Sequence, residues 1–354
     1  MLITNLKLQN FRNYDNLNVD FNKGINVIYG DNAQGKTNIL EAICLTSIGK
    51  SFRTNKDKEL IKFNKNYSKI EVQFSKLDRS GKINIEISNK KNILINGVNI
   101  KRLSELLGIL HIVIFTPDDI NILKNGPMYR RRFLDIFIGQ LRPNYIYCLN
   151  MYLKTLEQRN NYLKQIKLEN KSADFLDIWD EKLSEYAEKV YNYRLDFINK
   201  IKEKIIVVHN TITENKEKIN IEYISDFLNR KDFVNKLKNN RQADIIKGYT
   251  NKGIHRDDFY MYIDENLINI YGSQGQHRTA ILSLKMSELK VICDEIGESP
   301  ILLLDDFMSE LDDKRIKNFL ENISDTQVLI TGTDKISIEN LNFNVYNVKN
   351  GKII

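Results

Sequence analysis

The segment Gly30-Asp31-Asn32-Ala33-Gln34-Gly35-Lys36-Thr37 stands between two apolar stretches and indicates the fold class. It fits the phosphate-loop pattern G-x-x-x-x-G-K-[ST] at every fixed position. An apolar stretch that ends at Tyr29 precedes it and the apolar segment Ile39–Leu45 follows it, so the expected order of strand, loop and helix is present. Such a pattern also arises by chance in unrelated loops. With both flanking elements in place, we interpret it as a true phosphate loop.

Two side chains of this loop have defined chemical roles. A lysine at the position of Lys36 reaches the β- and γ-phosphates of a nucleotide, and a hydroxyl at the position of Thr37 binds Mg²⁺. The glycines let backbone N–H groups surround the phosphates, and the N-terminus of the following helix adds positive potential. We therefore predict that residues 30–37 bind ATP together with Mg²⁺, and that Lys36 also acts in catalysis.

A second motif is Pro300-Ile-Leu-Leu-Leu-Asp305-Asp306, an apolar stretch that ends in two acids. In phosphate-loop hydrolases, a buried strand of this kind (Walker B) delivers a carboxylate to Mg²⁺. We assign Asp305 to the metal and Asp306 to orienting or deprotonating the attacking water. The alternative is a core strand with solvated acids at its end. Because the same chain holds a phosphate loop, we favour the catalytic interpretation.

The segment Ile270-Tyr-Gly-Ser-Gln-Gly-Gln276 precedes a long predicted helix and lies about thirty residues before Asp305. It resembles the signature motif of ABC ATPases, in which a serine and glycine backbone at a helix start face a γ-phosphate. The chain already has its own phosphate loop, so the resemblance implies that Ser273, Gln274 and Gly275 contact ATP held by a second copy. That arrangement is a head-to-tail dimer with two ATP molecules. Taken alone, the segment could be an ordinary helix cap.

Further segments follow the order found in ABC ATPases, with some departures. Met308–Asp312 resembles the D-loop that comes after Walker B. Thr331 and Thr333 stand at the end of an apolar stretch where transport ATPases usually place a switch histidine. No clear Q-loop glutamine follows the predicted strand His111–Phe115. The nearest candidate, Gln140, falls inside a predicted helix.

The periodicity of apolar residues divides the chain into three parts. Strand-like alternation dominates residues 1–120, helical spacing dominates 121–244, and strands and helices alternate in 245–354. We predict an α/β fold: an ABC-type ATPase head with a mixed β-sheet, a phosphate loop and flanking helices, formed by the first and third parts. The middle part is predicted to be an inserted, all-helical arm. One apolar stripe in it favours helix packing over a cofactor site, and consists of Leu176, Trp179, Leu183, Tyr186, Val190 and Tyr193.

The composition of the 354 residues is that of a folded globular protein, with 42% hydrophobic and 28% charged residues. The formal charge of +7 suits a polyanionic partner, although a general bias towards lysine has the same effect. The three cysteines are far apart and form no Cys-x-x-Cys pair, which argues against a zinc site or a disulfide framework. No apolar run is long enough to cross a bilayer and no signal peptide is evident, so we expect a cytoplasmic protein without a membrane partner.

Taken together, the motifs resemble the RecF family of bacterial recombinational repair proteins, which is related to SMC ATPases. The resemblance runs in order over nearly the whole chain, and it is carried by the phosphate loop, the signature and Walker B together with Asn10–Tyr14, Phe115–Asp119, Pro127, Arg130–Asp135 and Gly253–Asp258. It implies ATP-dependent dimerisation on DNA, weak ATP hydrolysis, and cooperation with RecR and RecO at gaps in damaged DNA. It also implies roles in replication and SOS induction. Ile254 and His277 depart from the family pattern at positions with no assigned phosphate or metal contact.

Two basic clusters are candidates for contacts with DNA phosphates. One is Arg130, Arg131 and Arg132, and the other includes Lys50, Arg53, Lys56 and Lys58. Each cluster could equally be a solvated charged face. Arg12 could contact nucleotide phosphates or DNA. The segment His255-Arg256-Asp257-Asp258 could be a nucleotide or interface site, or simply an ion-paired turn. Whether the DNA is single-stranded, duplex or gapped is left open.

Two other functions share the phosphate loop. An ATPase subunit of a membrane transporter is disfavoured because the switch histidine is missing, the Q-loop is unclear and a helical segment is inserted. A small-molecule kinase would leave the segment Tyr271–Gln276 without a role. An SMC protein with a long coiled coil is excluded by length, since each helical residue adds only about 1.5 Å.

Overall fold

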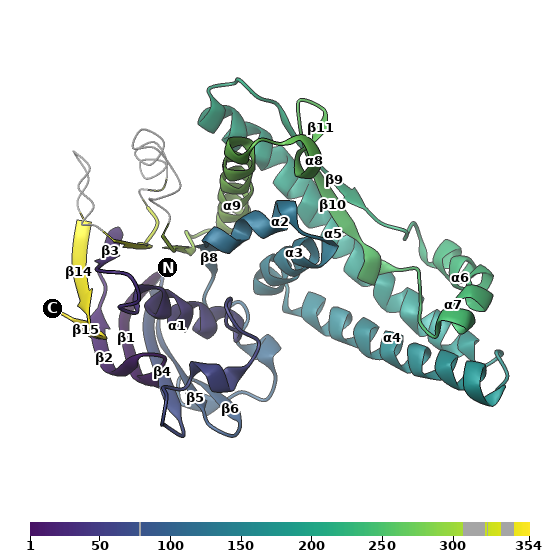
Figure 1. The fold of residues 1–354 in the computed structure, drawn as a ribbon, viewed down its shortest axis with the longest axis horizontal. Helices are drawn as coiled ribbons and strands as arrows, with labels where there is room; N and C mark the ends of the chain where they lie inside the picture. The colour runs from purple at the N-terminus through teal and green to yellow at the C-terminus, as the bar shows by residue number, and fades with distance from the viewer. Residues whose placement is uncertain (78, 307–322, 324, 334–342) are drawn as a thin grey trace. The chain divides into compact units, whose positions relative to one another are not determined.

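The computed structural model describes residues 1–77, 79–306, 323, 325–333 and 343–354. The chain divides into two compact units (Figure 1). The first unit contains Met1–Ile120 and Leu284–Ile354, and the second contains Asn121–Ser283. The predicted D-loop, Met308–Asp312, lies outside the described residues. Among the described helices, none combines the length and apolarity needed to cross a membrane.

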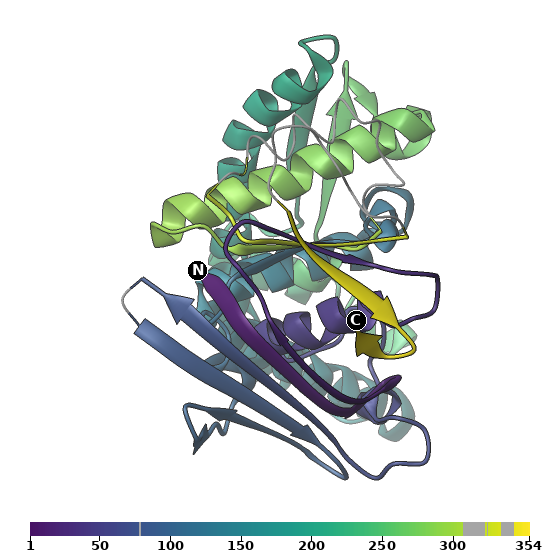
Figure 2. The same cartoon turned by 90° about the vertical axis from the view of Figure 1, so that its left-hand side faces the viewer.

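The first unit contains two six-stranded sheets. The antiparallel sheet has the strand order β2-β1-β4-β5-β6-β7, with the bounds β1 Leu2–Phe11, β2 Tyr14–Asp20, β4 Ser68–Lys76, β5 Arg79–Ile87, β6 Lys91–Ile95 and β7 Val98–Asn99. The second sheet has the order β15-β14-β3-β13-β12-β8 and is parallel except for β15. Its strands are β3 Ile25–Tyr29, β8 Ile112–Phe115, β12 Ile301–Leu304, β13 Val328–Gly332, β14 Phe343–Lys349 and β15 Lys352–Ile353. Figure 2 shows the antiparallel strands side by side in purple and blue.

Helix α1 (Lys36–Ile48) forms the centre of this unit because it contacts strands of both sheets. Residues 39–47 are all buried, which is the pattern of a helix covered on every side. The core joins apolar residues of α1 to those of the antiparallel strands and of the parallel sheet. Strand β12 is buried at all four positions, as expected for a parallel strand covered on both faces. The predicted strands at Ile25–Tyr29 and before Asp305 are thereby confirmed.

Strands β3, β12 and β13 run in the same direction and end at the same sheet edge. In their pairing, Gly332 lies opposite Tyr29, and Leu304 lies opposite Ile330. The residues that follow these strands are therefore neighbours in space although they are far apart in sequence. Ligands of open parallel sheets bind at this carboxyl edge.

The second unit consists of helices and a small sheet. Its two longest helices, α4 (Pro143–Glu169) and α5 (Leu176–Thr213), are joined by a short connection and pack against each other. The other helices are α2 Asn121–Lys124, α3 Pro127–Leu141, α6 Arg230–Asn239, α7 Arg241–Lys247, α8 Ile268–Tyr271 and the first part of α9 Gln274–Ile296. The sheet has the order β11-β10-β9, with β9 Ile219–Ile224, β10 Asp258–Ile263 and β11 Asn266–Leu267.

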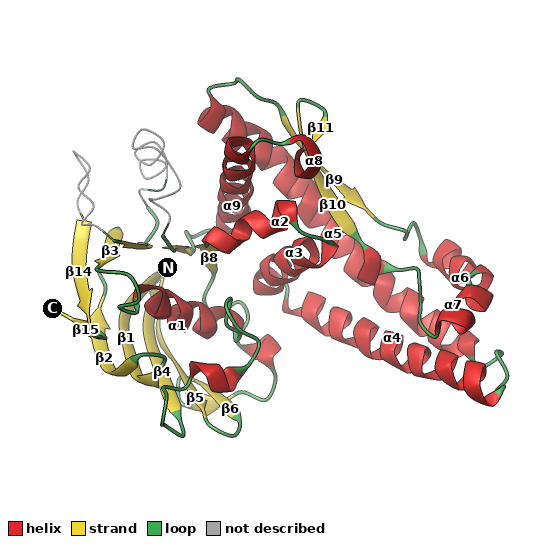
Figure 3. Ribbon diagram, in the orientation of Figure 1, coloured by secondary structure: helices red, strands yellow, loops and turns green. Residues whose placement is uncertain are grey.

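This sheet corrects two details of the predicted arm. The arm is not all helical, as the yellow strands among the red helices in Figure 3 show. In addition, residues 245–283 belong to the second unit and not to the head. The physical reason is the pairing of β10 with β9, which joins Asp258 to Ile224 and Ile263 to Ile219. The alternation in β10 predicts a strand, but it does not reveal the strand with which β10 pairs.

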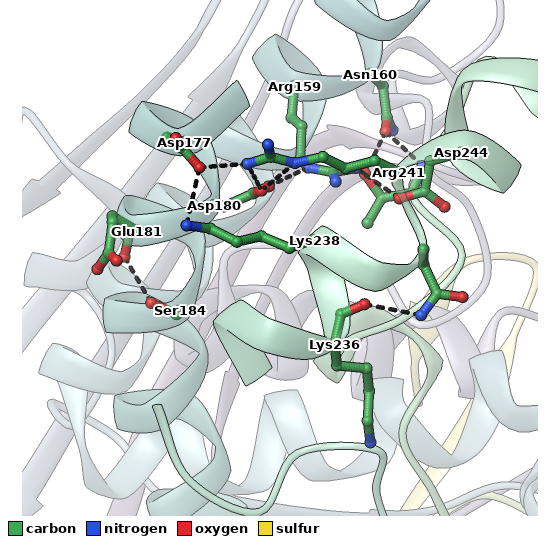
Figure 4. A network of polar contacts seen from close by, with 12 residues as sticks. Arg159, Asn160, Asp177, Asp180, Glu181, Ser184, Lys236, Lys238, Arg241 and Asp244 are labelled. Atoms are coloured by element: carbon green, nitrogen blue, oxygen red, sulfur yellow. Dashed lines mark hydrogen bonds and ion pairs between the residues drawn. The ribbon is translucent and has the colours of Figure 1, made fainter. Parts of the chain in front are cut away.

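Buried ion pairs connect the helices of this unit. The side chain of Arg159 on α4 is completely buried, and its guanidinium donates to Asp180 on α5 at 2.7 Å and to Asp244 on α7 at 2.8 Å (Figure 4). Arg241 adds a second guanidinium to Asp180 at 2.7 Å. Because removing one partner of such a pair leaves a buried charge uncompensated, these contacts fix how α4, α5 and α7 pack.

Candidate nucleotide-binding site

The backbone of the phosphate loop requires glycine at two positions. Gly30 and Gly35 have φ angles of 150° and 110°, which L-residues rarely adopt. A Cβ atom on Gly30 would lie 2.3 Å from the carbonyl oxygen of Val348. On Gly35 it would lie 2.5 Å from Nδ2 of Asn13. The loop therefore packs closely against its surroundings while it leads into α1.

The turn between β1 and β2 holds the loop in place. Asn13 donates from Nδ2 to the carbonyl of Gln34 at 2.7 Å and accepts at Oδ1 from Asn38 at 2.8 Å. The buried hydroxyl of Tyr14 donates to the carbonyl of Gly35 at 3.0 Å. Asn13 and Tyr14 belong to a segment that carries the family resemblance, and the sequence alone predicts no role for them at the site. Their contacts pre-organise the loop before any nucleotide arrives.

The ammonium group of Lys36 points back into the loop. It donates to the carbonyl oxygens of Gly30 at 2.6 Å and Asp31 at 2.7 Å. Burial lowers the pKa of Lys36, and the charges of Asp306, Asp31 and Asp305 oppose that effect. A cation held by two neutral carbonyls can transfer its hydrogen bonds to phosphate oxygens, which are stronger acceptors.

Thr37 and Asp305 meet as the sequence predicts for two ligands of one metal ion. The Thr37 hydroxyl donates to Oδ1 of Asp305 at 2.8 Å. Neighbouring oxygen ligands of an octahedral Mg²⁺, each about 2.1 Å from the ion, are about 3 Å apart. The spacing and the oxygen chemistry of this pair therefore fit Mg²⁺. Among the described residues, no cluster of three or more His, Cys, Asp or Glu side chains offers another metal site.

Thr331 connects the two acids of the site. Its hydroxyl donates to Oδ1 of Asp305 at 2.8 Å and accepts from the backbone N–H of Asp306 at 3.0 Å. Burial raises the pKa of Asp305, and the hydrogen bonds from Thr37 and Thr331 oppose that rise. Asp306 is exposed and has a φ angle of 49°, a strained conformation for a residue other than glycine. The threonine at the predicted switch position thus holds the backbone that presents Asp306.

A buried carboxylate on α1 gathers two arginines beside the loop. Glu41 has no exposed side-chain surface and accepts two hydrogen bonds from Arg12, at 2.8 Å and 2.7 Å. Arg53 lies 3.6 Å from the same carboxylate and donates to Oδ1 of Asn38 at 2.7 Å. Arg12, whose partner was left open between nucleotide and DNA, is therefore an ion-pair partner of Glu41. Lys50 is exposed.

The signature residues lie in the second unit, at the start of α9. Ser273 and Gln276 form a reciprocal cap: the N–H of Ser273 donates to Oε1 of Gln276 at 2.9 Å, and the N–H of Gln276 donates to the Ser273 hydroxyl at 3.2 Å. Ser273, Gln274 and Gly275 are all exposed. The segment therefore does form a helix cap. The cap leaves Ser273, Gln274 and Gly275 accessible to a second molecule.

The arginine cluster of α3 is not the uniform basic face that its sequence suggests. Arg130 is buried and its Nη2 donates to Asp258 at 2.9 Å, while Nη1 donates to the carbonyl of Ile122 at 3.0 Å. The predicted contact of Arg130 with DNA is therefore corrected, because this guanidinium is used inside the protein. Arg131 is half-buried and donates to the carbonyl of Asp257 at 2.7 Å. Arg132 is exposed.

The segment His255-Arg256-Asp257-Asp258 is an ion-paired turn. Asp257 is 1% exposed and pairs with Arg194 of α5 at 3.2 Å, while the hydroxyls of Tyr223 and Ser225 also donate to it. Burial raises the pKa of Asp257, and Arg194 opposes that rise. These contacts favour the structural alternative for the segment over a nucleotide site.

Two further predictions concern the loops of ABC ATPases. Gln140, the nearest Q-loop candidate, is buried within α3. Thr333, the second candidate for the switch position, is exposed. Thr331 donates a hydrogen bond to Asp305 of the site.

Comparisons with known proteins agree with the motifs. Residues 2–353 match the family model described as the RecF/RecN/SMC N terminal domain. The chain is 42% identical, over its full length and 99% of the relative's, to the DNA replication and repair protein RecF of Clostridium acetobutylicum. It matches the structure of the recombination mediator protein RecF with ATP in the RecFOR pathway at 39% identity and a TM-score of 0.93, covering 99% of this chain and 96% of that one.

A more distant match shows how widely the fold is shared. The SMC head bound to the C-terminal winged-helix domain of ScpA matches with a TM-score of 0.60 at 17% identity, covering 100% of this chain and 97% of that one. At this identity the match is evidence for the fold alone. None of these matches supports a transporter ATPase subunit or a small-molecule kinase.

Proposed function

This chain belongs to the RecF/RecN/SMC N-terminal domain family, as a RecF-type DNA replication and repair protein, and on that premise we propose that it closes as a dimer on DNA when it binds ATP. The observation that carries the proposal is the meeting of Lys36, Thr37 and Asp305 at one edge of the parallel sheet. These residues supply a cation for phosphates and two oxygen ligands for Mg²⁺.

Hydrolysis of ATP follows from the same residues. Lys36 leaves the loop carbonyls and binds the β- and γ-phosphates. Thr37 and Asp305 are the residues that would hold Mg²⁺, and a bound ion would neutralise charge on the phosphates. Asp306, presented by the backbone that Thr331 holds, accepts a proton from the attacking water. The hydrolysis is weak and serves to release the closed state, not to turn over substrate.

The composite site requires two copies of the chain. Ser273, Gln274 and Gly275 of one copy complete the phosphate loop of the other, so two ATP molecules are enclosed in a head-to-tail dimer. Their exposure at the start of α9 supports this role, because free N–H groups at a helix N-terminus favour a phosphate. ATP therefore acts as part of the interface.

DNA is the polyanionic partner of the closed dimer. The exposed residues Lys50, Arg53 and Arg132, together with half-buried Arg131, are the candidates for phosphate contacts. RecR and RecO are the proposed protein partners in recombinational repair of gaps and in SOS induction, because the similar solved structure is of RecF in the RecFOR pathway.

Sedimentation of the protein with ATP, with ADP and without nucleotide, each with and without DNA, tests this function. We expect a dimer only with ATP, and tighter association with DNA in that state. A sedimentation coefficient that does not change with nucleotide would refute ATP-driven dimerisation.

Mixing two inactive variants tests the composite site. Ser273→Arg blocks the signature surface, and Lys36→Ala disables the phosphate loop. Each variant alone has two broken sites, whereas a mixed dimer has one site with both halves intact. We expect part of the ATPase activity to return in proportion to the fraction of mixed dimer. Absence of recovery despite demonstrated mixed dimers would contradict a site shared between copies.

A further inference from the structure

The first turn of α9 has a polar partner, Glu217, in addition to the reciprocal cap between Ser273 and Gln276. Gln276 uses Oε1 to accept from the N–H of Ser273 at 2.9 Å, which leaves its amide Nε2 to donate elsewhere. That Nε2 donates to Oε1 of Glu217 at 3.1 Å. Glu217 lies in the connection between α5 and β9 and is 25% exposed. Gln276 therefore joins the signature serine to a carboxylate that lies 59 residues before the glutamine in the chain.

Glu217 also lies near a buried histidine of α5. Its Oε2 lies 3.5 Å from Nε2 of His209, a completely buried residue in the last turns of α5. Nδ1 of His209 lies 2.9 Å from the hydroxyl of Ser283, and that hydroxyl donates to the carbonyl of Thr279 at 2.9 Å. Both Ser283 and Thr279 are in α9. His209 of α5 thus contacts α9 at Ser283, and Glu217, in the connection after α5, contacts α9 at Gln276.

The contact between Gln276 and Glu217 bears on the direction in which the start of α9 points. An isolated cap fixes the hydrogen bonds within a helix start, but it does not fix where that start points. The turn that carries Ser273 is exposed, so its neighbours in the second unit must hold it in position. The contact from Gln276 to Glu217 supplies a fixed point directly beside the cap.

We propose that Glu217 is a positioning residue for ATP hydrolysis, which acts through Gln276 to aim Ser273 at the phosphate held by a second copy. The inference rests on the proposed composite site and names a residue that the signature motif does not contain. Glu217 touches neither nucleotide nor metal. It sets the direction of the helix start on which the phosphate contact depends, so its loss slows hydrolysis without weakening the binding of ATP to residues 30–37.

Exchanging the donor and the acceptor of the hydrogen bond between Gln276 and Glu217 tests the proposal. In Gln276→Glu, the new carboxylate still accepts from the N–H of Ser273, because glutamate serves the reciprocal cap as well as glutamine does. It can no longer donate to Glu217, and two carboxylates now face each other. In the double variant Gln276→Glu with Glu217→Gln, the donor and the acceptor have changed places and the contact can form again. Glu217→Gln alone, whose amide oxygen still accepts, completes the cycle.

We expect Gln276→Glu to lower kcat by about tenfold or more, since a shift of about 1 Å at a reacting centre can cost about a hundredfold. ATP affinity, measured by direct binding, stays within twofold of the wild type. The double variant regains at least half of the lost rate, and Glu217→Gln alone loses less than Gln276→Glu. The matched control is Glu222→Gln, which changes a carboxylate on β9 whose described hydrogen bond is to Tyr262.

The inference is overturned if Gln276→Glu hydrolyses ATP at the wild-type rate, or if the double variant is as slow as Gln276→Glu. It is also overturned if kcat and the melting temperature fall together in every variant, because a purely structural role predicts that result. Ser273→Arg, measured in parallel, separates this inference from the proposed function. If Ser273→Arg retains full activity, the proposed composite site is wrong. If Ser273→Arg is inactive while the variants at Gln276 and Glu217 keep the wild-type rate, only the role of Glu217 is wrong.

Discussion

Replacement of Thr331 by valine removes one hydroxyl and preserves the shape of the side chain. In the wild type this hydroxyl donates to buried Asp305 at 2.8 Å and accepts from the N–H of Asp306 at 3.0 Å. Valine can do neither. The substitution therefore removes the link between Asp305 and Asp306 and leaves both acids in the chain. Thr331→Ser, which keeps the hydroxyl, is the matched control.

The cost follows from the two lost hydrogen bonds. A hydrogen bond to a charged group contributes about 1.5–3 kcal/mol, and Asp305 keeps the one from Thr37. We therefore expect Thr331→Val to lower the free energy of unfolding by about 2 kcal/mol, or about 4–8 °C in melting temperature for a unit of this size. The loss at Asp306 affects catalysis more, because a misplaced acid lowers kcat by about ten- to a hundredfold.

The pH dependence gives a sharper readout. Burial already raises the pKa of Asp305, and the hydrogen bond from Thr331 opposes that rise. Removing the bond raises the pKa further. Because Mg²⁺ needs the ionised carboxylate, activity is present above this pKa and is lost as the pH falls through it. The acidic limb of the kcat/KM profile should therefore move to higher pH in Thr331→Val and stay in place in Thr331→Ser.

The assay is steady-state ATP hydrolysis across pH, with thermal melting of the same samples. Two results would refute the reasoning. One is a Thr331→Val enzyme with wild-type kcat, which would mean that Thr331 does not hold Asp306 in its working position. The other is an acidic limb that shifts equally in the serine and valine variants, which would make the hydroxyl irrelevant to Asp305.

Three further predictions concern residues with distinct surroundings. Lys36→Ala should abolish productive ATP binding, because it removes the ammonium group that the loop carbonyls of Gly30 and Asp31 hold in place for the phosphates; normal affinity in a nucleotide-binding assay would disprove the assignment. Asp306→Asn should keep Mg²⁺·ATP bound but slow hydrolysis and prolong the ATP dimer, which sedimentation and single-turnover measurements would check. Arg130→Ala should lower the free energy of unfolding by about 3–5 kcal/mol, since it strands buried Asp258, while DNA affinity at fixed salt stays unchanged if the protein remains folded; a marked loss of affinity would return Arg130 to the DNA-binding surface.

The chemical identity of the site could be predicted because each of its parts is a continuous run of residues. The phosphate loop needs only its own glycines, Lys36 and Thr37 between a strand and a helix, and Walker B needs only an apolar strand before Asp305. Such patterns depend on local geometry, so one sequence suffices to read them. The parallel strands that bring Thr37 to Asp305 then follow from the usual order of these elements.

The roles of the arginines depend on residues that the local sequence does not reveal. Arg130 and Arg132 are equivalent in a basic run, yet one is buried against Asp258, 128 positions away, and the other is exposed. The same holds for Arg12, whose partner Glu41 belongs to a helix that is buried on every side. An arginine pairs inside the protein when the fold places a carboxylate beside it, and it is accessible to a ligand when the fold does not.

Local runs of residues therefore predict the nucleotide chemistry, whereas the packing of distant segments provides the contacts around it. No local pattern predicts that Asn13 holds the phosphate loop or that Glu217 contacts the start of α9. The link that Thr331 makes between Asp305 and Asp306 is equally hidden in the sequence. Each of these contacts consists of one or two hydrogen bonds between segments that are separated in the chain. Its formation depends on how sheets and helices pack, and packing is a property of the whole unit and not of any one segment.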